Sequence, residues 1–250
     1  MKIIILAAGR GIRLRPLTKK LPKSLIDVGN KPILHHILSM IQTIEPSEVV
    51  IVGGHGFPQL QSFLEHWNND NSKFFLHQDS SNRSILTLLR NQQYRSGNLL
   101  SLMVAQEFFT EDLIIMNSDH IYPEKLFHTF ISSCSENTTI ACDFDRSLSD
   151  DDMKIHRTGS NYLKRISKSL QRFDGGYIGL TFIPKSMTKN YLDAMEQTLQ
   201  DKGQNAVVED VLPTLINHGY NIQISDMSGY GWLEIDTLDD LKLAEKALWI

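Results

Sequence analysis

The chain has 250 residues and a formal net charge of −4, from 25 Lys or Arg and 29 Asp or Glu side chains. A net negative charge argues against a general nucleic-acid-binding protein. No apolar run approaches the roughly twenty residues of a membrane span, and the N-terminus shows no secretory signal. Cys134 and Cys142 provide neither a disulfide framework nor a metal-binding spacing. The length suits one large α/β domain, so we expect a single domain over residues 1–250. The cysteine usage and the lack of a signal or span fit a location in the reducing cytoplasm.

The first 31 residues carry most of the positive charge. They hold eight Lys or Arg side chains and one Asp, a net charge of +7, whereas the other 219 residues together carry −11. Residues 2–6 form an apolar run typical of a strand buried on both faces of a parallel sheet. The small residues of Ala7-Ala8-Gly9-Arg10-Gly11 follow, and they allow backbone amides to approach an anion closely. The segment therefore predicts a polyphosphate-binding loop.

Two common phosphate-binding motifs do not match this loop. The dinucleotide fingerprint requires a third glycine, and Leu14 occupies that position. The ATPase P-loop requires Gly-Lys followed by Ser or Thr, which is absent. A basic N-terminal arm that contacts nucleic acid is a further alternative, but such an arm would not begin with a five-residue apolar strand.

Hydrophobic periodicity predicts alternating strands and helices along the rest of the chain. Residues 78–98 are polar and rich in turn residues. We expect helices from Pro32 onward, at 57–67, 101–109, 123–132, 185–199 and 207–218, and after Thr237, which forms a capping box with Asp240. We expect strands at 48–52, 73–77, 112–117, 138–143, 175–183 and 221–225, and a hairpin at 153–169. This order predicts an α/β fold, with a Rossmann-like, mixed but mainly parallel sheet flanked by helices and a small β-hairpin lobe.

Acidic residues follow two of the predicted strands. Asp119 stands at the carboxyl end of strand 112–117, where open α/β sheets bind ligands, so it is placed to hold a cation; capping of the next turn is the alternative. On a strand, Glu234 and Asp236 share a face. Two carboxylates on one face repel unless a cation lies between them, although they could instead form the exposed side of an edge strand. Together with the basic loop, these residues predict a site for a polyphosphate and Mg²⁺.

Other candidate ligands have structural interpretations. His35 and His36 are adjacent, point to different faces of a helix and are interpreted as structural. The aspartates of 143–152 do not follow the EF-hand order, so we interpret this segment as a solvated turn. Five aromatic residues could form a cage for a quaternary ammonium group or pack in the ordinary way. They are Tyr122, Tyr162, Tyr177, Tyr230 and Trp232.

Two runs, LAAGRGIRLRPLT at 6–18 and PKSL at 22–25, resemble the signature of the sugar-phosphate nucleotidyltransferase superfamily. Residues 97–102, 116–122 and 236–237 look most like inositol-1-phosphate cytidylyltransferases, and the phosphocholine and phosphonate cytidylyltransferases are similar in the same places. The resemblance implies the nucleotidyltransferase (GT-A-like) fold and Mg²⁺-dependent transfer of CMP from CTP to a small phosphorylated or phosphonate acceptor. A sugar-1-phosphate enzyme that uses UTP or dTTP and a non-catalytic nucleotide-binding subunit remain alternatives, and a homodimer is left open.

The resemblance also implies roles for individual residues. Arg13, Lys23 and Lys168 would bind and neutralise the phosphates of the nucleotide and the acceptor. The family usually has Ser or Thr where Ile12 stands, so one hydroxyl contact to phosphate is missing. The nucleotide would be held by Leu6, Ala7, Ala8, Gly9, Arg10, Gly11, Asn98 and Ser101, Mg²⁺ by Asp119, Asp236 and Glu234, and the acceptor pocket would be lined by Gly175 and Gly176.

Overall fold

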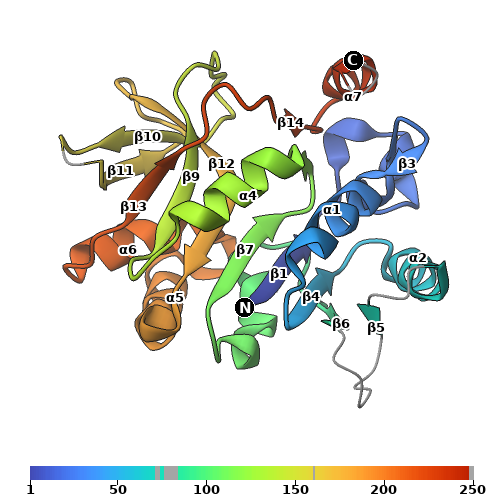
Figure 1. Cartoon of the computed structure of the whole chain (residues 1–250), viewed down its shortest axis with the longest axis horizontal. Helices are drawn as coiled ribbons and strands as arrows, with labels where there is room; N and C mark the ends of the chain where they lie inside the picture. Colours follow the sequence, from blue (N-terminus) through green and yellow to red (C-terminus); the bar gives the residue numbers. More distant parts are fainter. Residues whose placement is uncertain (71–73, 76–83, 160, 248–250) are drawn as a thin grey trace.

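The computed structural model describes residues 1–70, 74–75, 84–159 and 161–247. Within these residues a ten-stranded sheet forms the centre of the molecule, with the path β11-β10-β12-β7-β1-β4-β6-β5 from one edge to the other (Figure 1). Strand β9 pairs with β12 and β13 beside this path. The strands are β1 (Lys2–Ala7), β2 (Asp27–Val28), β3 (Lys31–Pro32), β4 (Glu48–Gly53), β5 (Phe74–Phe75), β6 (Ser84–Arg90), β7 (Leu113–Asn117), β8 (His120–Ile121), β9 (Thr139–Asp143), β10 (Lys154–Arg157), β11 (Leu163–Ser167), β12 (Gly175–Ile183), β13 (Gln223–Asp226) and β14 (Leu233–Glu234).

Helices cover both faces of the sheet. The helices are α1 (Ile33–Ile41), α2 (Phe57–Asp70), α3 (Leu99–Val104), α4 (Glu124–Ser133), α5 (Thr188–Lys202), α6 (Val211–Asn217) and α7 (Leu238–Ala247). Along β1, Ile3 and Ile5 join the core under α1, α2 and α4, while Ile4 and Leu6 join the core under α3, α5 and α6. Because each face of β1 is buried, the strand has no polar alternation, and the predicted buried strand is confirmed.

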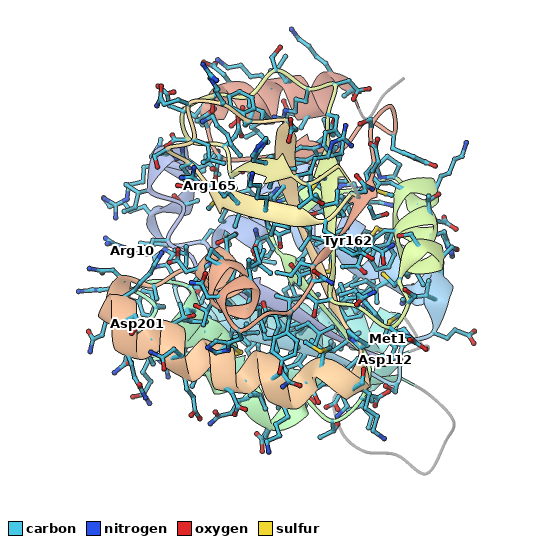
Figure 2. The ribbon with its side chains drawn as sticks, turned by 90° about the vertical axis from the view of Figure 1, so that its left-hand side faces the viewer. Met1, Arg10, Asp112, Tyr162, Arg165 and Asp201 are labelled. Atoms are coloured by element: carbon cyan, nitrogen blue, oxygen red, sulfur yellow. The ribbon has the colours of Figure 1, made fainter. Side chains whose placement is uncertain are left out.

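The centre of the sheet is parallel and one flank is antiparallel, which confirms the mixed sheet. Strand β1 pairs in parallel with both β4 and β7, whereas β12 pairs in antiparallel fashion with β7, β9 and β10. Leu6 is opposite Asn117 in the parallel register. The segments that follow β1 and β7 therefore begin side by side, at the carboxyl ends of the parallel strands. In Figure 2 Arg10 marks this side of the molecule, while Met1 and Asp112 lie together on the opposite side.

One predicted loop contains a strand of the central sheet. The polar, turn-rich segment predicted at 78–98 contains β6, which pairs in parallel with β4 from Ile85 to Arg90. Its sequence, Ile85-Leu86-Thr87-Leu88-Leu89, is apolar enough for an inner strand, but the polar residues on each side obscured it. The strand predicted at 73–77 lies partly outside the described residues, and Phe74–Phe75 form β5. The predicted hairpin is confirmed as β10 and β11.

The start of α7 is fixed by the predicted capping box. The backbone N–H of Thr237 donates to Asp240 Oδ2 at 2.7 Å, and the Asp240 N–H donates to Thr237 Oγ1 at 3.2 Å. Asp240 Oδ2 also accepts the backbone N–H of Asp236 at 3.1 Å, so the box orders the segment just before the helix. Both histidines that were interpreted as structural make packing or backbone contacts: His35 packs edge-on against Trp67, and His36 Nε2 lies 2.8 Å from the backbone oxygen of Val28.

A Thr237→Ala variant is expected to lose about 1 kcal/mol of unfolding free energy, the usual cost of removing a hydroxyl N-cap. Urea unfolding followed by circular dichroism measures it. The matched control is Asp239→Ala, which changes the neighbouring exposed residue that pairs with Lys242 at 2.9 Å. A surface pair of this kind contributes little, so equal losses in the two variants would contradict the capping role of Thr237.

Among the described residues, no helix combines the length and apolar character required to cross a membrane.

Candidate active site

A cavity of about 140 Å³ lies where β1 and β7 end. We call it the glycine-loop cavity. Residues 6–9, at the end of β1 and in its loop, form one part of the lining, and residues 117–119, at the end of β7, form another. Gly9 is exposed here and has open space where a Cβ atom would lie, so a ligand can approach its backbone closely. The cavity is lined by Leu6, Ala7, Ala8, Gly9, Lys23, Ser24, Asn98, Ser101, Asn117, Ser118 and Asp119.

Lys23 joins the two acidic segments of the chain. Its Nζ lies 2.7 Å from Asp119 Oδ2 and also donates to Asp236 Oδ1. Arg13 donates to the other oxygen of Asp236 and lies 2.6 Å from Asp151 Oδ2. Residues from the N-terminal loop, the end of β7 and the segment after β14 therefore meet in one charged cluster.

Burial and the neighbouring charges shift the pKa values of the residues in this cluster. Burial disfavours the ammonium form of Lys23, but Asp119 and Asp236 more than offset this, so the pKa of Lys23 lies above its usual value. Burial opposes the charged form of Asp119 as well, yet Lys23 and His120 hold the pKa of its carboxyl well below its usual range. Burial raises the pKa of Glu234. At neutral pH Lys23 is thus an ammonium ion and Asp119 a carboxylate.

A second cavity, of about 190 Å³, adjoins the first and shares Asn98, Asn117 and Asp119 with it. We call it the acidic cavity, because six carboxyl side chains line it and Lys168 is the one Lys or Arg side chain among its described lining residues. Lys168 comes from the turn after β11, on the hairpin lobe. The carboxyl side chains are Asp119, Asp151, Asp152, Glu209, Glu234 and Asp236.

Most of the residues proposed from the sequence lie around these cavities. Ser101 is buried and accepts a hydrogen bond from Asn91 at 2.9 Å. Arg10 and Gly11 follow Gly9 but are not among the described residues that line either cavity. Gly175 and Gly176 are likewise absent from the described lining. A Cβ atom on Gly175 would clash with Asp143 and Phe144, and one on Gly176 would clash with Leu148, so their role in the acceptor pocket stays a prediction.

Two interpretations of acidic segments need correction. Glu234 and Asp236 were expected on one strand, but β14 ends at Glu234, and Asp236 lies in the irregular segment between β14 and α7. Both nevertheless line the acidic cavity. The turn at 143–152 is exposed at Asp145, Asp150 and Asp151 as expected, but Asp143 is buried, and Asp151 and Asp152 line that cavity. Tertiary contacts from distant segments, which periodicity cannot reveal, cause both differences.

The site also contains residues that sequence reasoning missed. Ser24 lines the glycine-loop cavity beside Lys23, and its hydroxyl is buried without a protein partner. Gly179 of β12, which was also missed, lines the acidic cavity. Of the five aromatic candidates, Tyr177 alone belongs to the described lining, while Tyr122 and Trp232 each stack on His120. A serine adjacent to a predicted phosphate-binding lysine was the one signal available in the sequence.

The described residues contain no group of three His, Cys, Asp or Glu side chains arranged to hold a metal ion by themselves. Asp119 and Asp236 do converge on one point, since both contact Lys23 Nζ. Mg²⁺ is commonly bound by one or two carboxylates, water and substrate phosphates rather than by a complete protein cage. The two carboxylates fit that pattern, with Lys23 now in the position between them.

Comparisons with known proteins point to one family. The family model described as Nucleotidyl transferase matches residues 2–146. The CTP:phosphoglutamine cytidylyltransferase of Campylobacter jejuni is 25% identical over 269 residues, covering 97% of this chain and 98% of the relative. A bifunctional IPC transferase and DIPP synthase of Aquifex aeolicus is 24% identical over 247 residues, and the chain spans 51% of its length. A UTP–glucose-1-phosphate uridylyltransferase of Haloferax volcanii is 28% identical over 126 residues, 50% of this chain and 46% of the relative.

Solved structures share the fold over nearly the whole chain. The inositol-1-phosphate CTP transferase of T. maritima superposes with a TM-score of 0.77 at 19% identity, covering 98% of this chain and 93% of that one. The CTP:phosphocholine cytidylyltransferase of Streptococcus pneumoniae gives a TM-score of 0.73 at 17% identity, covering 99% and 98%. These likenesses confirm the predicted nucleotidyltransferase fold.

Proposed function

Because the chain belongs to the nucleotidyl transferase family, we propose that it is a Mg²⁺-dependent cytidylyltransferase that transfers CMP from CTP to a small phosphorylated or phosphonate acceptor. The observation that carries the proposal is the contact of Lys23 with both Asp119 and Asp236 beside the glycine-loop cavity. A cationic group and a pair of carboxylates that can hold a divalent ion are the components that phosphoryl-type transfer needs.

The glycine-loop cavity is proposed to hold the nucleotide. Gly9 would offer backbone amides to the phosphates, and Arg13 and Lys23 would neutralise them. Ser101 would contact the base. Its oxygen already accepts the amide hydrogen of Asn91, so its own proton is free to be donated. Cytosine N3 accepts a hydrogen bond whereas the uracil N3–H donates one, so a donating Ser101 favours CTP.

The acidic cavity is proposed to hold the acceptor. A phosphate monoester is largely dianionic at neutral pH, with a second pKa of about 6, so it needs no general base. One acceptor oxygen would attack the α-phosphorus of CTP, and the bond to the β-phosphate oxygen would break as pyrophosphate leaves with the electron pair. Lys168 and Lys23 would reduce the repulsion between the two anions. Mg²⁺, when bound at Asp119 and Asp236, would neutralise charge on the transferred and leaving groups.

One relative favours CTP and another favours a different nucleotide. The name of the C. jejuni relative describes a CTP-dependent enzyme, and its match covers nearly all of this chain. The uridylyltransferase of H. volcanii matches half of it. A sugar-1-phosphate uridylyltransferase is therefore the second candidate.

The test is a matrix of nucleotides and acceptors with Mg²⁺. CTP, UTP, dTTP, ATP and GTP would each be combined with inositol 1-phosphate, phosphocholine, aminoethylphosphonate and glucose 1-phosphate, with pyrophosphate release and product mass as readouts. We expect CTP to exceed every other nucleotide by at least about tenfold in kcat/KM, as expected when a polar base contact must be matched. Preferential use of UTP with glucose 1-phosphate would favour the second candidate instead.

A further inference from the structure

Beside the charged cluster, the ring of His120 stacks on two aromatic residues. Its centroid lies 5.7 Å from that of Tyr122 with an interplanar angle of 18°, and 5.3 Å from that of Trp232 with an angle of 12°. The guanidinium of Arg146 lies over the Trp232 ring, 4.2 Å from its centroid. We call Tyr122, His120, Trp232 and Arg146 the His120 stack. Its three rings are buried, so they form a packed unit next to the site.

Hydrogen bonds at the edges fix the orientation of the rings around His120. Tyr122 Oη donates to the backbone oxygen of Ile178 at 2.5 Å. Trp232 Nε1 donates to Asp143 Oδ2 at 2.7 Å, and the other oxygen of Asp143 accepts the backbone N–H of Arg146 at 3.2 Å. Rotation of either ring would leave a buried polar group unpaired, which is costly. The plane in which His120 is held is therefore well defined.

His120 makes its polar contact with Asp119. Its Nδ1 lies 2.5 Å from Asp119 Oδ1, while Asp119 Oδ2 accepts from Lys23 at 2.7 Å. A carboxylate can only accept, so Nδ1 carries the hydrogen whether the imidazole is neutral or charged. The two oxygens of Asp119 thus have different, fixed donors. In the β8–β14 strand pair, His120 is also opposite Glu234. This pairing joins the segment that carries Asp119 to the segment that carries Glu234 and Asp236.

We propose that His120 is a positioning residue for the Asp119 carboxylate. Held in place by Tyr122 and Trp232, it fixes the plane of Asp119 for binding Mg²⁺, and in this respect the inference rests on the proposed function. Hydrogen-bond partners of metal ligands are worth 10- to 100-fold in metal affinity or activity. A residue that only filled space here would need no donor, because an apolar ring could stack in the same way.

Three substitutions separate positioning from packing. His120→Phe keeps a flat ring in the stack and removes the donor. His120→Asn keeps a donor close to the position of Nδ1 and removes the ring. His156→Phe is the matched control, because His156 also bonds an aspartate through Nδ1, Asp174 at 2.8 Å, but lies exposed on the hairpin lobe.

Mg²⁺ binding is measured by titration calorimetry. The chain is first saturated with a CTP analogue whose α,β-bridging oxygen is replaced by methylene. We expect His120→Phe to weaken Mg²⁺ binding 10- to 100-fold while its unfolding temperature stays near that of the wild type. His120→Asn is expected to recover part of the affinity, and His156→Phe to leave it unchanged. In turnover assays, His120→Phe should raise the half-saturating Mg²⁺ concentration more than it lowers kcat at saturating Mg²⁺.

The outcomes are distinguishable from a failure of the proposed function. If the wild type binds neither Mg²⁺ nor the CTP analogue, the proposed function and this inference fall together. If the wild type binds both and His120→Phe binds Mg²⁺ equally well, the positioning role alone is overturned. Trp232→Leu is an independent test that leaves His120 and Asp119 intact. It should weaken Mg²⁺ binding in the same direction, and unchanged binding would remove the stack from the explanation.

Discussion

Asp119→Asn and Asp236→Asn are each expected to lower turnover by at least about 10²-fold with little effect on the fold. Asparagine keeps the shape of the side chain but removes the negative charge that a divalent cation requires. The magnitude follows from other preorganised electrostatic contacts, where one group is worth about 10²–10³ in kcat. Each variant leaves Lys23 one carboxylate partner, so the buried ammonium group keeps an ion pair. Pyrophosphate release with CTP, Mg²⁺ and the best acceptor measures the effect.

Asp174→Asn is the matched control for both variants. Asp174 also pairs with a histidine and accepts a backbone hydrogen bond, but it lies just before β12 and is not among the described residues that line either cavity. It should retain wild-type turnover. Near-normal pyrophosphate release by the Asp119 or Asp236 variant would refute their assignment as metal ligands. A loss of turnover that accompanies a large drop in unfolding temperature would instead indicate a structural role.

Lys23→Met is expected to reduce kcat/KM more than 100-fold, because the main cation between the two anionic substrates is lost. This corresponds to a loss of about 3 kcal/mol of transition-state stabilisation. A second effect follows from the structure. Without the ammonium ion that both contact, Asp119 and Asp236 are neighbouring carboxylates with no cation between them, and like charges repel. Mg²⁺ can replace the missing charge, so it should raise the unfolding temperature of Lys23→Met more than that of the wild type.

Thermal unfolding with and without Mg²⁺, in the absence of nucleotide, tests this second effect. The control is Lys20→Met, a change at an exposed lysine of the same basic segment. Binding to the native state alone stabilises it in proportion to the logarithm of the ion concentration, so a series of Mg²⁺ concentrations adds a check. Equal Mg²⁺ shifts in all three proteins would mean that Lys23 does not occupy the place of a metal ion.

Local sequence was sufficient for the elements whose signal lies within a few residues. The run Ile3-Ile4-Ile5 is typical of a strand buried on both faces, and the structure places it at the centre of the sheet. The capping box at Thr237 was equally local, because both of its partners lie within three residues. Strand β6 was missed because its apolar core is short and polar residues flank it.

The sequence by itself determined the positive charge and the small side chains of the N-terminal loop, since the size and charge of a side chain follow from the residue type alone. Only the tertiary structure decided which distant groups meet there. Lys23 and Asp236 are 213 positions apart, and their contact depends on the β8–β14 pairing and on the bend before α7. The tertiary structure likewise turned the acidic 143–152 segment toward the site and placed His120 among buried rings. Periodicity reports which face of an element is buried, whereas a site depends on which elements become neighbours.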